Sequence, residues 1–150
     1  MNLSENFTYE ELTHTDHREF DNTPNEAEMA NLVRLANFLE QVKEVLGGKP
    51  IMINSAFRCA EVNKAVGSSD KSQHRHGCAA DIRVPGMTPD QVVQAIIASD
   101  LPFDQCLREF SSPSGGGWTH ISIPNIEGHE PRMQALIVDK QGTRPYEPFA

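Results

Sequence analysis

Residues 72–81 read Ser72-Gln73-His74-Arg75-His76-Gly77-Cys78-Ala79-Ala80-Asp81 and place an imidazole and a carboxylate seven residues apart across a glycine. A second imidazole follows at His120. Two imidazoles and one carboxylate can hold a zinc ion with one coordination position left open for water, whereas a structural zinc site closes all four positions, usually with Cys. Cys59, Cys78 and Cys106 are far apart in the chain. The pattern therefore favours an open zinc site over a structural one.

Length and composition narrow the class of protein. A chain of 150 residues fits one domain, 1–150, that buries roughly 70% of its unfolded surface. The Cys residues are few and odd in number, and the first residues do not form a basic and then apolar segment. These features predict synthesis in a reducing cytoplasm without a signal peptide. Because no apolar run approaches ~20 residues, we expect no membrane insertion. A net charge of −8 disfavours a nucleic-acid partner, and the simplest assembly is a monomer.

Three segments carry helix signals. Residues 24–46 have Thr23 as the expected N-cap, with Pro24 at the first helical position, Glu26 completing a capping box and Gly47 as the stop. The same start signal, Thr-Pro-Asp-Gln at 88–91, predicts a helix that runs to about Ser99. A short helix is expected between them, over 59–66.

Five segments have the alternation and β-branched content of strands, namely 51–55, 79–84, 105–110, 118–123 and 133–139. Their order along the chain predicts an α+β fold, with a mostly antiparallel sheet and helices packed on one face. Alternation in 79–84 sets Asp81 opposite the apolar face, and alternation in 118–123 does the same for His120. We therefore expect both ligand candidates on the open face of the sheet.

At these residues the chain resembles the zinc peptidases that include D-alanyl-D-alanine carboxypeptidases, D-alanyl-D-alanine dipeptidases and phage L-alanyl-D-glutamate endopeptidases, which share a Hedgehog-like fold. The shared pattern is Ser-x-His-x-x-Gly-x-Ala-x-Asp at 72–81, with Ser-Ala-Phe-Arg at 55–58 upstream and Trp-Thr-His-Ile-Ser at 118–122 downstream. Early elements, at 7–12 and 21–24, resemble the phage endolysin-like branch.

The resemblance implies that His74, Asp81 and His120 bind one Zn²⁺ ion. It implies that Arg58 engages the substrate carboxylate or the scissile carbonyl, and we expect Ser72 and Trp118 to line the substrate site. The best-described members carry an acidic residue three positions before the last His, where this chain has Gly117. Glu109, at the end of the preceding strand, is the natural replacement as general base.

Other histidines have weaker patterns. His76 forms His-x-His with His74, but the family pattern leaves its position variable. His14 and His17 are spaced to share one helical face, although no third ligand lies nearby in the sequence.

Three functions remain open from the sequence. The leading one is a zinc peptidase that cuts peptidoglycan stem peptides as an endolysin-like L-alanyl-D-glutamate endopeptidase or a D-alanyl-D-alanine carboxypeptidase, made in a host cytoplasm and acting on the cell wall after release. The second is a catalytically silent zinc-binding phage structural or binding module, favoured by Gly117. The third is a cytoplasmic dipeptidase that acts on D-alanyl-D-alanine.

Overall fold

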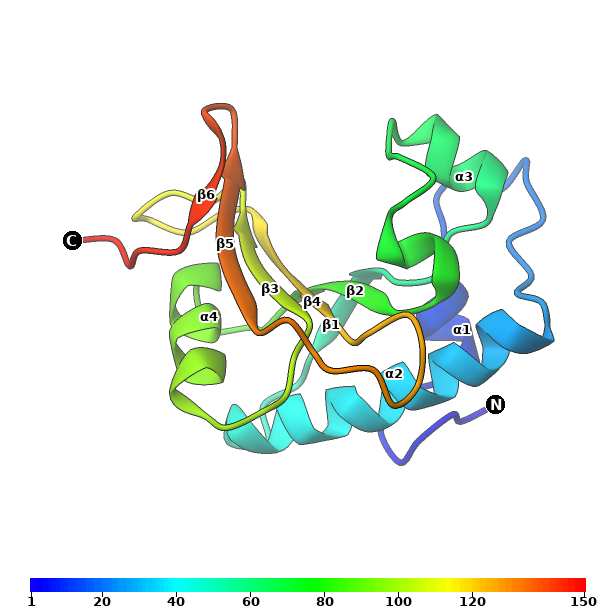
Figure 1. Ribbon diagram of the computed structural model, residues 1–150, viewed down its shortest axis with the longest axis horizontal. Helices are drawn as coiled ribbons and strands as arrows, with labels where there is room; N and C mark the ends of the chain where they lie inside the picture. Colours follow the sequence, from blue (N-terminus) through cyan, green and yellow to red (C-terminus); the bar gives the residue numbers. More distant parts are fainter.

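One six-stranded sheet, with strand order β1-β2-β4-β3-β5-β6, runs through the computed structural model, which describes all 150 residues (Figure 1). The elements in chain order are α1 (Tyr9–Thr13), α2 (Glu26–Val45), β1 (Met52–Ser55), α3 (Ala60–Ala65), the 3₁₀ helix η1 (Gln73–His76), β2 (Ala79–Arg83), α4 (Pro89–Ala98), β3 (Gln105–Glu109), β4 (Trp118–Ser122), β5 (Gln134–Asp139) and β6 (Gly142–Pro145). This is the α+β class that the sequence predicts.

Strand pairing is mostly antiparallel, as expected. Only the β3–β5 pair is parallel. In the antiparallel β2–β4 pair, Asp81 is the register partner of His120, and Ala80 is the partner of Ile121. Direct partners point to the same face of a sheet. The register thus confirms that Asp81 and His120 share one face, while the apolar residues of the same strands share the other.

Helix α2 begins two residues later than predicted, and the Thr23 cap with Glu26 is wrong. The cap is Asn25, whose side chain accepts from the Glu28 backbone N–H while the Glu28 carboxylate accepts from the Asn25 N–H. The Thr23 hydroxyl instead donates to Asp21, at 2.5 Å. Because Thr88-Pro89 does begin α4, the Thr-Pro pair alone does not fix a helix start, and at α2 the Asn25–Glu28 capping box sets it.

The other predicted helices are confirmed. Thr88 caps α4 in a capping box with Gln91. Cys59 precedes α3, and Gly67 follows it with a φ of 76°. Three elements were not predicted: α1, β6, and η1 inside the motif at 72–81.

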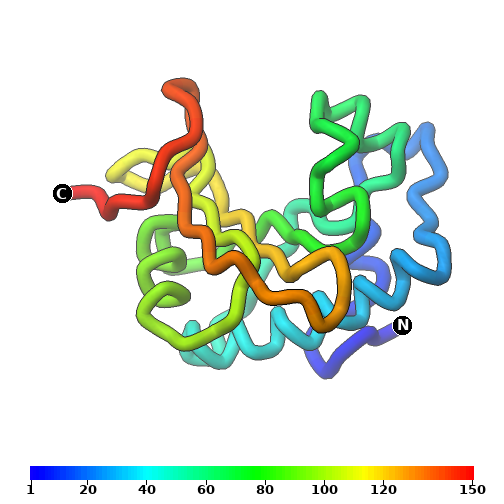
Figure 2. Tube along the Cα trace, in the orientation of Figure 1, coloured from blue at the N-terminus to red at the C-terminus, as the bar shows by residue number.

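The core joins the two longer helices to one face of the sheet. It is a cluster of 25 buried apolar residues that includes Leu35 and Leu39 of α2, Val93 of α4, and Ile82 and Ile121 of the sheet. Figure 1 shows α2 and α4 below the sheet, whereas α3 and the β5–β6 turn rise above it. The tube in Figure 2 shows the same arrangement, with the N- and C-termini on opposite sides. The apolar face of the sheet is therefore used for packing and the polar face is left for the site.

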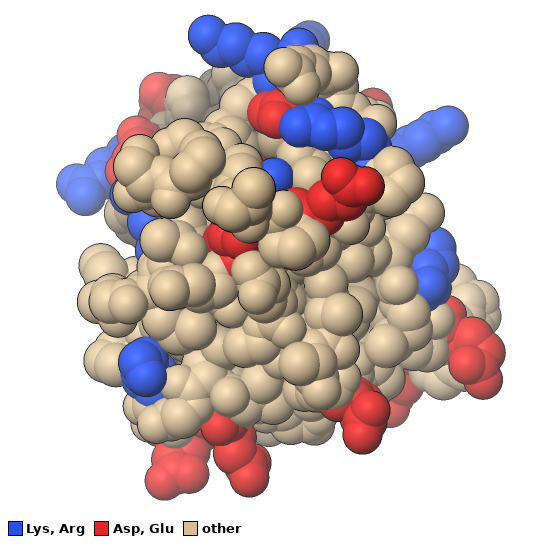
Figure 3. Space-filling model, turned by 90° about the vertical axis from the view of Figure 1, so that its left-hand side faces the viewer, with Lys and Arg blue, Asp and Glu red and all other residues tan.

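Charge is unevenly spread over the surface on the C-terminal side. Figure 3 shows several Lys and Arg along the upper edge of this face, whereas Asp and Glu lie both beside them in the upper half and along the lower edge. The upper edge is the side on which α3 and the β5–β6 turn rise in Figure 1. None of the helices combines the length and apolar character of a membrane span.

Candidate metal centre

A glycine turn brings His74 back toward Asp81. His74 lies on η1, and Gly77 ends that helix in the left-handed region with a φ of 76°, its N–H directed to the carbonyls of Gln73 and His74. A Cβ at Gly77 would lie 2.9 Å from the backbone oxygen of Glu28. Both the backbone conformation and the available space therefore require glycine here.

The imidazole of His74 is held in one orientation by a backbone carbonyl. Its Nδ1 lies 2.7 Å from the carbonyl oxygen of Ala56. Because a carbonyl only accepts, Nδ1 carries the proton and Nε2 keeps its lone pair. That Nε2 lies 3.3 Å from Oδ1 of Asp81. A histidine whose second nitrogen donates to a carbonyl is the usual arrangement of a metal ligand.

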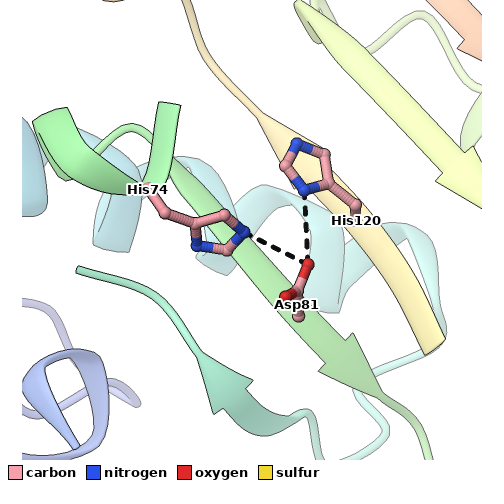
Figure 4. A group of neighbouring side chains, drawn as sticks. All are labelled: His74, Asp81 and His120. Carbon is pink, nitrogen blue, oxygen red and sulfur yellow. Dashed lines mark hydrogen bonds and ion pairs between the residues drawn. The ribbon is translucent and has the colours of Figure 1, made fainter. Parts of the chain in front are cut away.

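His120 approaches the same carboxylate oxygen from β4. Its Nδ1 lies 3.2 Å from Oδ1 of Asp81, while its Nε2 is buried without a hydrogen-bond partner. Figure 4 shows the two rings converging on Asp81 from η1 and from β4. One ligand atom from each of the three residues lies within 4.8 Å of the others. The structure thus brings together the three predicted ligands.

The two contacts to Asp81 have the spacing expected between ligands of a zinc ion. In a tetrahedral site with bonds of about 2.0–2.1 Å, ligand atoms lie about 3.3–3.4 Å apart. The contacts from His74 and His120 to Asp81 measure 3.3 and 3.2 Å. Two imidazoles and one carboxylate also form the donor set of catalytic zinc, which keeps one position for water or substrate.

Electrostatics keep the Asp81 carboxylate ionised. Burial alone would raise the pKa of Asp81, but its contacts with His74 and His120 lower it well below the usual range. His74 and His120 are also its only ion-pair partners. A half-buried carboxylate whose only ion pairs are with two imidazoles is a natural binding site for a divalent cation.

Glu109 stands beside the three ligands, at the end of β3. Its Oε1 lies 3.7 Å from Nδ1 of His120. Burial raises the pKa of Glu109, although the neighbouring His120 and Arg58 act to lower it. A raised pKa brings a carboxylate closer to the range in which it can both take and return a proton near neutral pH.

The structure also explains the missing acid at Gly117. This residue has a φ of 68°, and a Cβ there would lie 2.2 Å from the backbone oxygen of Glu109. No side chain fits between the end of β3 and the start of β4. The position used by the best-described members is therefore closed in this chain, and the carboxylate next to His120 comes from Glu109 instead.

Every predicted site residue lines one pocket. The pocket has a volume of about 420 Å³. Nη2 of Arg58 lies 3.5 Å from the Ser72 hydroxyl, and the Arg58 Nε is buried without a partner. Burial lowers the pKa of Arg58, while Asp81 and Glu109 oppose that effect. The predicted residues on its wall are Arg58, Ser72, His74, Asp81, Glu109, Trp118 and His120.

Other parts of the pocket were not predicted. Phe110 and the segment 66–68 at the end of α3 also line it. The contact between His74 and the Ala56 carbonyl could not be predicted from the sequence, because every residue has a backbone carbonyl. Phe110 had a weak signal, since it is an apolar residue directly before the glycine-rich loop at 111–117.

The remaining histidines lie outside the site. His76 is exposed at the end of η1. His14 and His17 follow α1, which ends at Thr13, so they do not share a helical face. Each contacts a nearby acid only, with His14 at 3.4 Å from Asp16 and His17 at 3.3 Å from Glu19.

A family-level sequence profile described as Peptidase M15 matches residues 5–122. The chain belongs to the peptidase M15 family. The match covers all seven predicted site residues, from Arg58 to His120. M15 peptidases are zinc dependent, so membership supports a zinc metallopeptidase with His74, Asp81 and His120 as the possible metal site. None of the curated proteins compared with the chain matches it significantly.

Proposed function

We propose that this M15 peptidase hydrolyses an amide bond in peptidoglycan stem peptides, with water as the nucleophile. The observation that carries the proposal is the convergence of His74, Asp81 and His120 in a pocket that also holds Glu109 and Arg58. These are the parts that a zinc hydrolase needs: ligands that leave a position open, a proton acceptor and a cation for the developing charge.

The ligands would act by holding one Zn²⁺ ion. When bound, zinc supplies Lewis-acid chemistry, which lowers the pKa of water to about 7 and polarises a carbonyl group. The chain's part is to fix the ligand atoms. The Ala56 carbonyl orients His74, and the register of β2 with β4 orients Asp81 and His120. This support would hold the three ligand atoms in place for the ion.

Glu109 would take the proton from the attacking water and return it to the leaving amine. Its raised pKa suits both steps, and its position beside His120 places it at the edge of the ligand set. Arg58 would bind either the oxyanion that develops on the scissile carbonyl or a carboxylate of the substrate. Its buried, unpartnered Nε leaves donor capacity for such a group.

The substrate class rests on the resemblance of residues 72–81 and 118–122 to peptidoglycan peptidases. We propose cleavage of either the L-alanyl-D-glutamate or the terminal D-alanyl-D-alanine bond, by an endolysin-like enzyme that acts on the wall after release from a host cytoplasm. Residues 1–150 would form a zinc peptidase domain with a Hedgehog-like fold, in which α2 and α4 pack on one face of the sheet.

One observation favours the alternative of a silent zinc-binding module, namely the lack of an acid at Gly117. Glu109 counters it because its carboxylate reaches the same neighbourhood. The two proposals differ in whether Glu109 is needed for turnover.

The test is digestion of purified peptidoglycan by the zinc-loaded protein, with released amines counted and fragments identified by mass spectrometry. The peptidase proposal expects one class of bond to be cut by the wild type, and Glu109→Gln to retain zinc while losing activity. Glu44→Gln, at an exposed carboxylate on α2, is the matched control and should retain activity. Zinc binding without any amine release by the wild type would favour the silent module.

A further inference from the structure

Phe110 combines backbone strain with exposure at the edge of the metal pocket. Its φ is 51°, and Met133 is the only other non-glycine residue with a positive φ. The Phe110 side chain is 48% exposed although it is large and apolar. A bulky residue in the left-handed region costs free energy, and such strain gathers at functional sites. Phe110 also directly follows the proposed base, Glu109.

The strained conformation is built in by its neighbours. The Phe110 N–H donates to the Val138 carbonyl of β5, at 2.9 Å. Gly117 lies so close that a Cβ there would be 2.6 Å from the Phe110 carbonyl carbon and oxygen. A bridge between Ser112 and Gly115 then closes the loop. The backbone of Phe110 is therefore held on both sides.

The ring of Phe110 lies against that of Trp118. Their centroids are 5.5 Å apart and their planes are tilted by 33°. Both residues line the metal pocket, as do residues 66–68 at the end of α3. The pocket thus combines ionisable residues with a pair of aromatic rings.

Phe110 also belongs to a second, shallower pocket of about 340 Å³. Its other lining residues are Ser111 and residues 139–141 at the β5–β6 turn. Phe110 is therefore part of the lining of both pockets. A molecule that occupied both would contact it.

We propose that Phe110 is a substrate-binding residue that selects an extended peptide, which runs from the metal pocket over the Phe110 ring toward the β5–β6 turn. The inference rests on the proposed peptidase function. A ring wall with no charge suits the methyl and methylene groups of a peptide such as a stem peptide, which gain contact area as the ring is covered. A dipeptide in the metal pocket can meet only the part of the ring that lines that pocket, so it gains less from Phe110 than an extended peptide does.

The chain offers its own probe for the test, because Trp118 is its only tryptophan. Intrinsic fluorescence therefore reports binding at the aromatic wall, and calorimetry gives an independent Kd. The ligands are the stem tetrapeptide L-alanyl-D-isoglutamyl-L-lysyl-D-alanine and the dipeptide L-alanyl-D-isoglutamate. Binding is measured with zinc-loaded protein in the Glu109→Gln background, where turnover is blocked.

The variants are Phe110→Ala and Phe110→Gly, with Met133→Gly as the matched control. Met133 has nearly the same φ, 53°, and the same 48% exposure, but it lines neither pocket. We expect both Phe110 variants to weaken tetrapeptide binding about tenfold and to change dipeptide binding less than twofold. Met133→Gly should change neither. Glycine relieves the strain at both positions, so Phe110→Gly should unfold at the same or a higher temperature than wild type.

Each outcome separates the two proposals. If Phe110→Ala and Phe110→Gly bind the tetrapeptide as tightly as the parent while wild type cuts peptidoglycan, the inference is wrong and the peptidase function stands. If wild type cuts neither peptide nor peptidoglycan, yet the Phe110 variants lose tetrapeptide binding, the wall is confirmed and the peptidase function is wrong. An equal loss of binding for both peptides also overturns the selection of extended substrates.

Discussion

Two aspartates, the half-buried Asp81 and the buried Asp90, show how differently this fold treats a carboxylate. Asp90, at the start of α4, accepts from Arg108 at 2.5 Å, from the Tyr146 hydroxyl at 2.7 Å, from Gln94 at 2.8 Å and from the Phe149 N–H at 3.3 Å. The only ion pairs of Asp81 are with two imidazoles, which share its Oδ1. Asp90 is neutralised by a direct ion pair with Arg108, whereas Asp81 has no direct ion pair with Lys or Arg and is free to bind a metal cation.

Strand β3 links the two clusters. Arg108 and Glu109 are consecutive, so alternation directs Arg108 to the cluster of Asp90 and Glu109 to the metal pocket. The C-terminal segment covers the Arg108 guanidinium, which lies 3.6 Å from the ring centroid of Phe149. Arg108, on one face of β3, therefore contributes to stability, and Glu109, on the other face, contributes to the proposed catalysis.

The same substitution in the two clusters should have different results, and the largest effect is expected at Asp81. Asp81→Asn removes the anionic ligand, so we expect loss of zinc binding and a fall in activity of about a thousandfold or more. Zinc should raise the melting temperature of the wild type but not of this variant. Metal analysis after gel filtration and thermal unfolding check both points. A variant that retained one zinc per chain would contradict the assignment.

Asp90→Asn should cost stability and leave the metal site intact. The Arg108 guanidinium would remain buried without its anion, which destabilises by about 3–5 kcal/mol when a buried pair is broken. Denaturant unfolding of the metal-free protein measures the loss. Zinc stoichiometry below the unfolding transition should stay at one per chain. If zinc were lost while stability was unchanged, the division between the two clusters would be wrong.

Gly116 and Gly117, which follow β3 in the loop before β4, differ in how closely they are packed. Gly117→Ala should destabilise the protein by about 3 kcal/mol and lower activity, because the new Cβ meets the Glu109 and Phe110 backbone. Gly116→Ala is the control, since its φ of 76° is similar and nothing lies within 4 Å of the new Cβ. It should cost only about 1 kcal/mol. Equal losses in the two variants would show that close packing at Gly117 is unimportant.

Lowering the pH should weaken the stabilising contribution of the Asp90 cluster, and we expect this to be the smallest of the predicted effects. Burial alone would raise the pKa of Asp90, but bonds from Tyr146, Arg108 and Gln94 lower it in the folded state. A lowered pKa contributes stability that is complete above the unfolded value of about 3.9 and is lost as pH falls toward the folded value. The stability difference between wild type and Asp90→Asn should therefore shrink below about pH 4. A difference that stayed constant down to pH 2 would contradict this linkage.

Much of the site could be predicted because its ligands lie on elements with strong patterns. Alternation in β2 and β4 sufficed to put Asp81 and His120 on one face, and Gly77 marked the turn that carries His74. The start of α2 was misjudged because Thr23 and Asn25 are both good caps, and a hydrogen bond to Asp21 decides between them. Strand β6 has no apolar alternation, and its place depends on pairing with β5.

The rest depends on contacts between distant residues. The cluster of Asp90, Arg108 and Tyr146 forms only once α4, β3 and the C-terminal segment meet. The strained φ of Phe110 depends on Val138 and Gly117. Local patterns along the chain do not predict such contacts, because spacing and alternation describe single helices or strands only.

X-ray absorption at the zinc edge of the loaded protein tests the central claim most directly. The account predicts one zinc per chain, surrounded by four nitrogen or oxygen atoms at about 2.0–2.1 Å, with two imidazoles in the shell and no sulfur. His74→Ala and His120→Ala should each remove one imidazole or the ion itself. A shell that contained thiolate, or that was unchanged in both variants, would contradict the account.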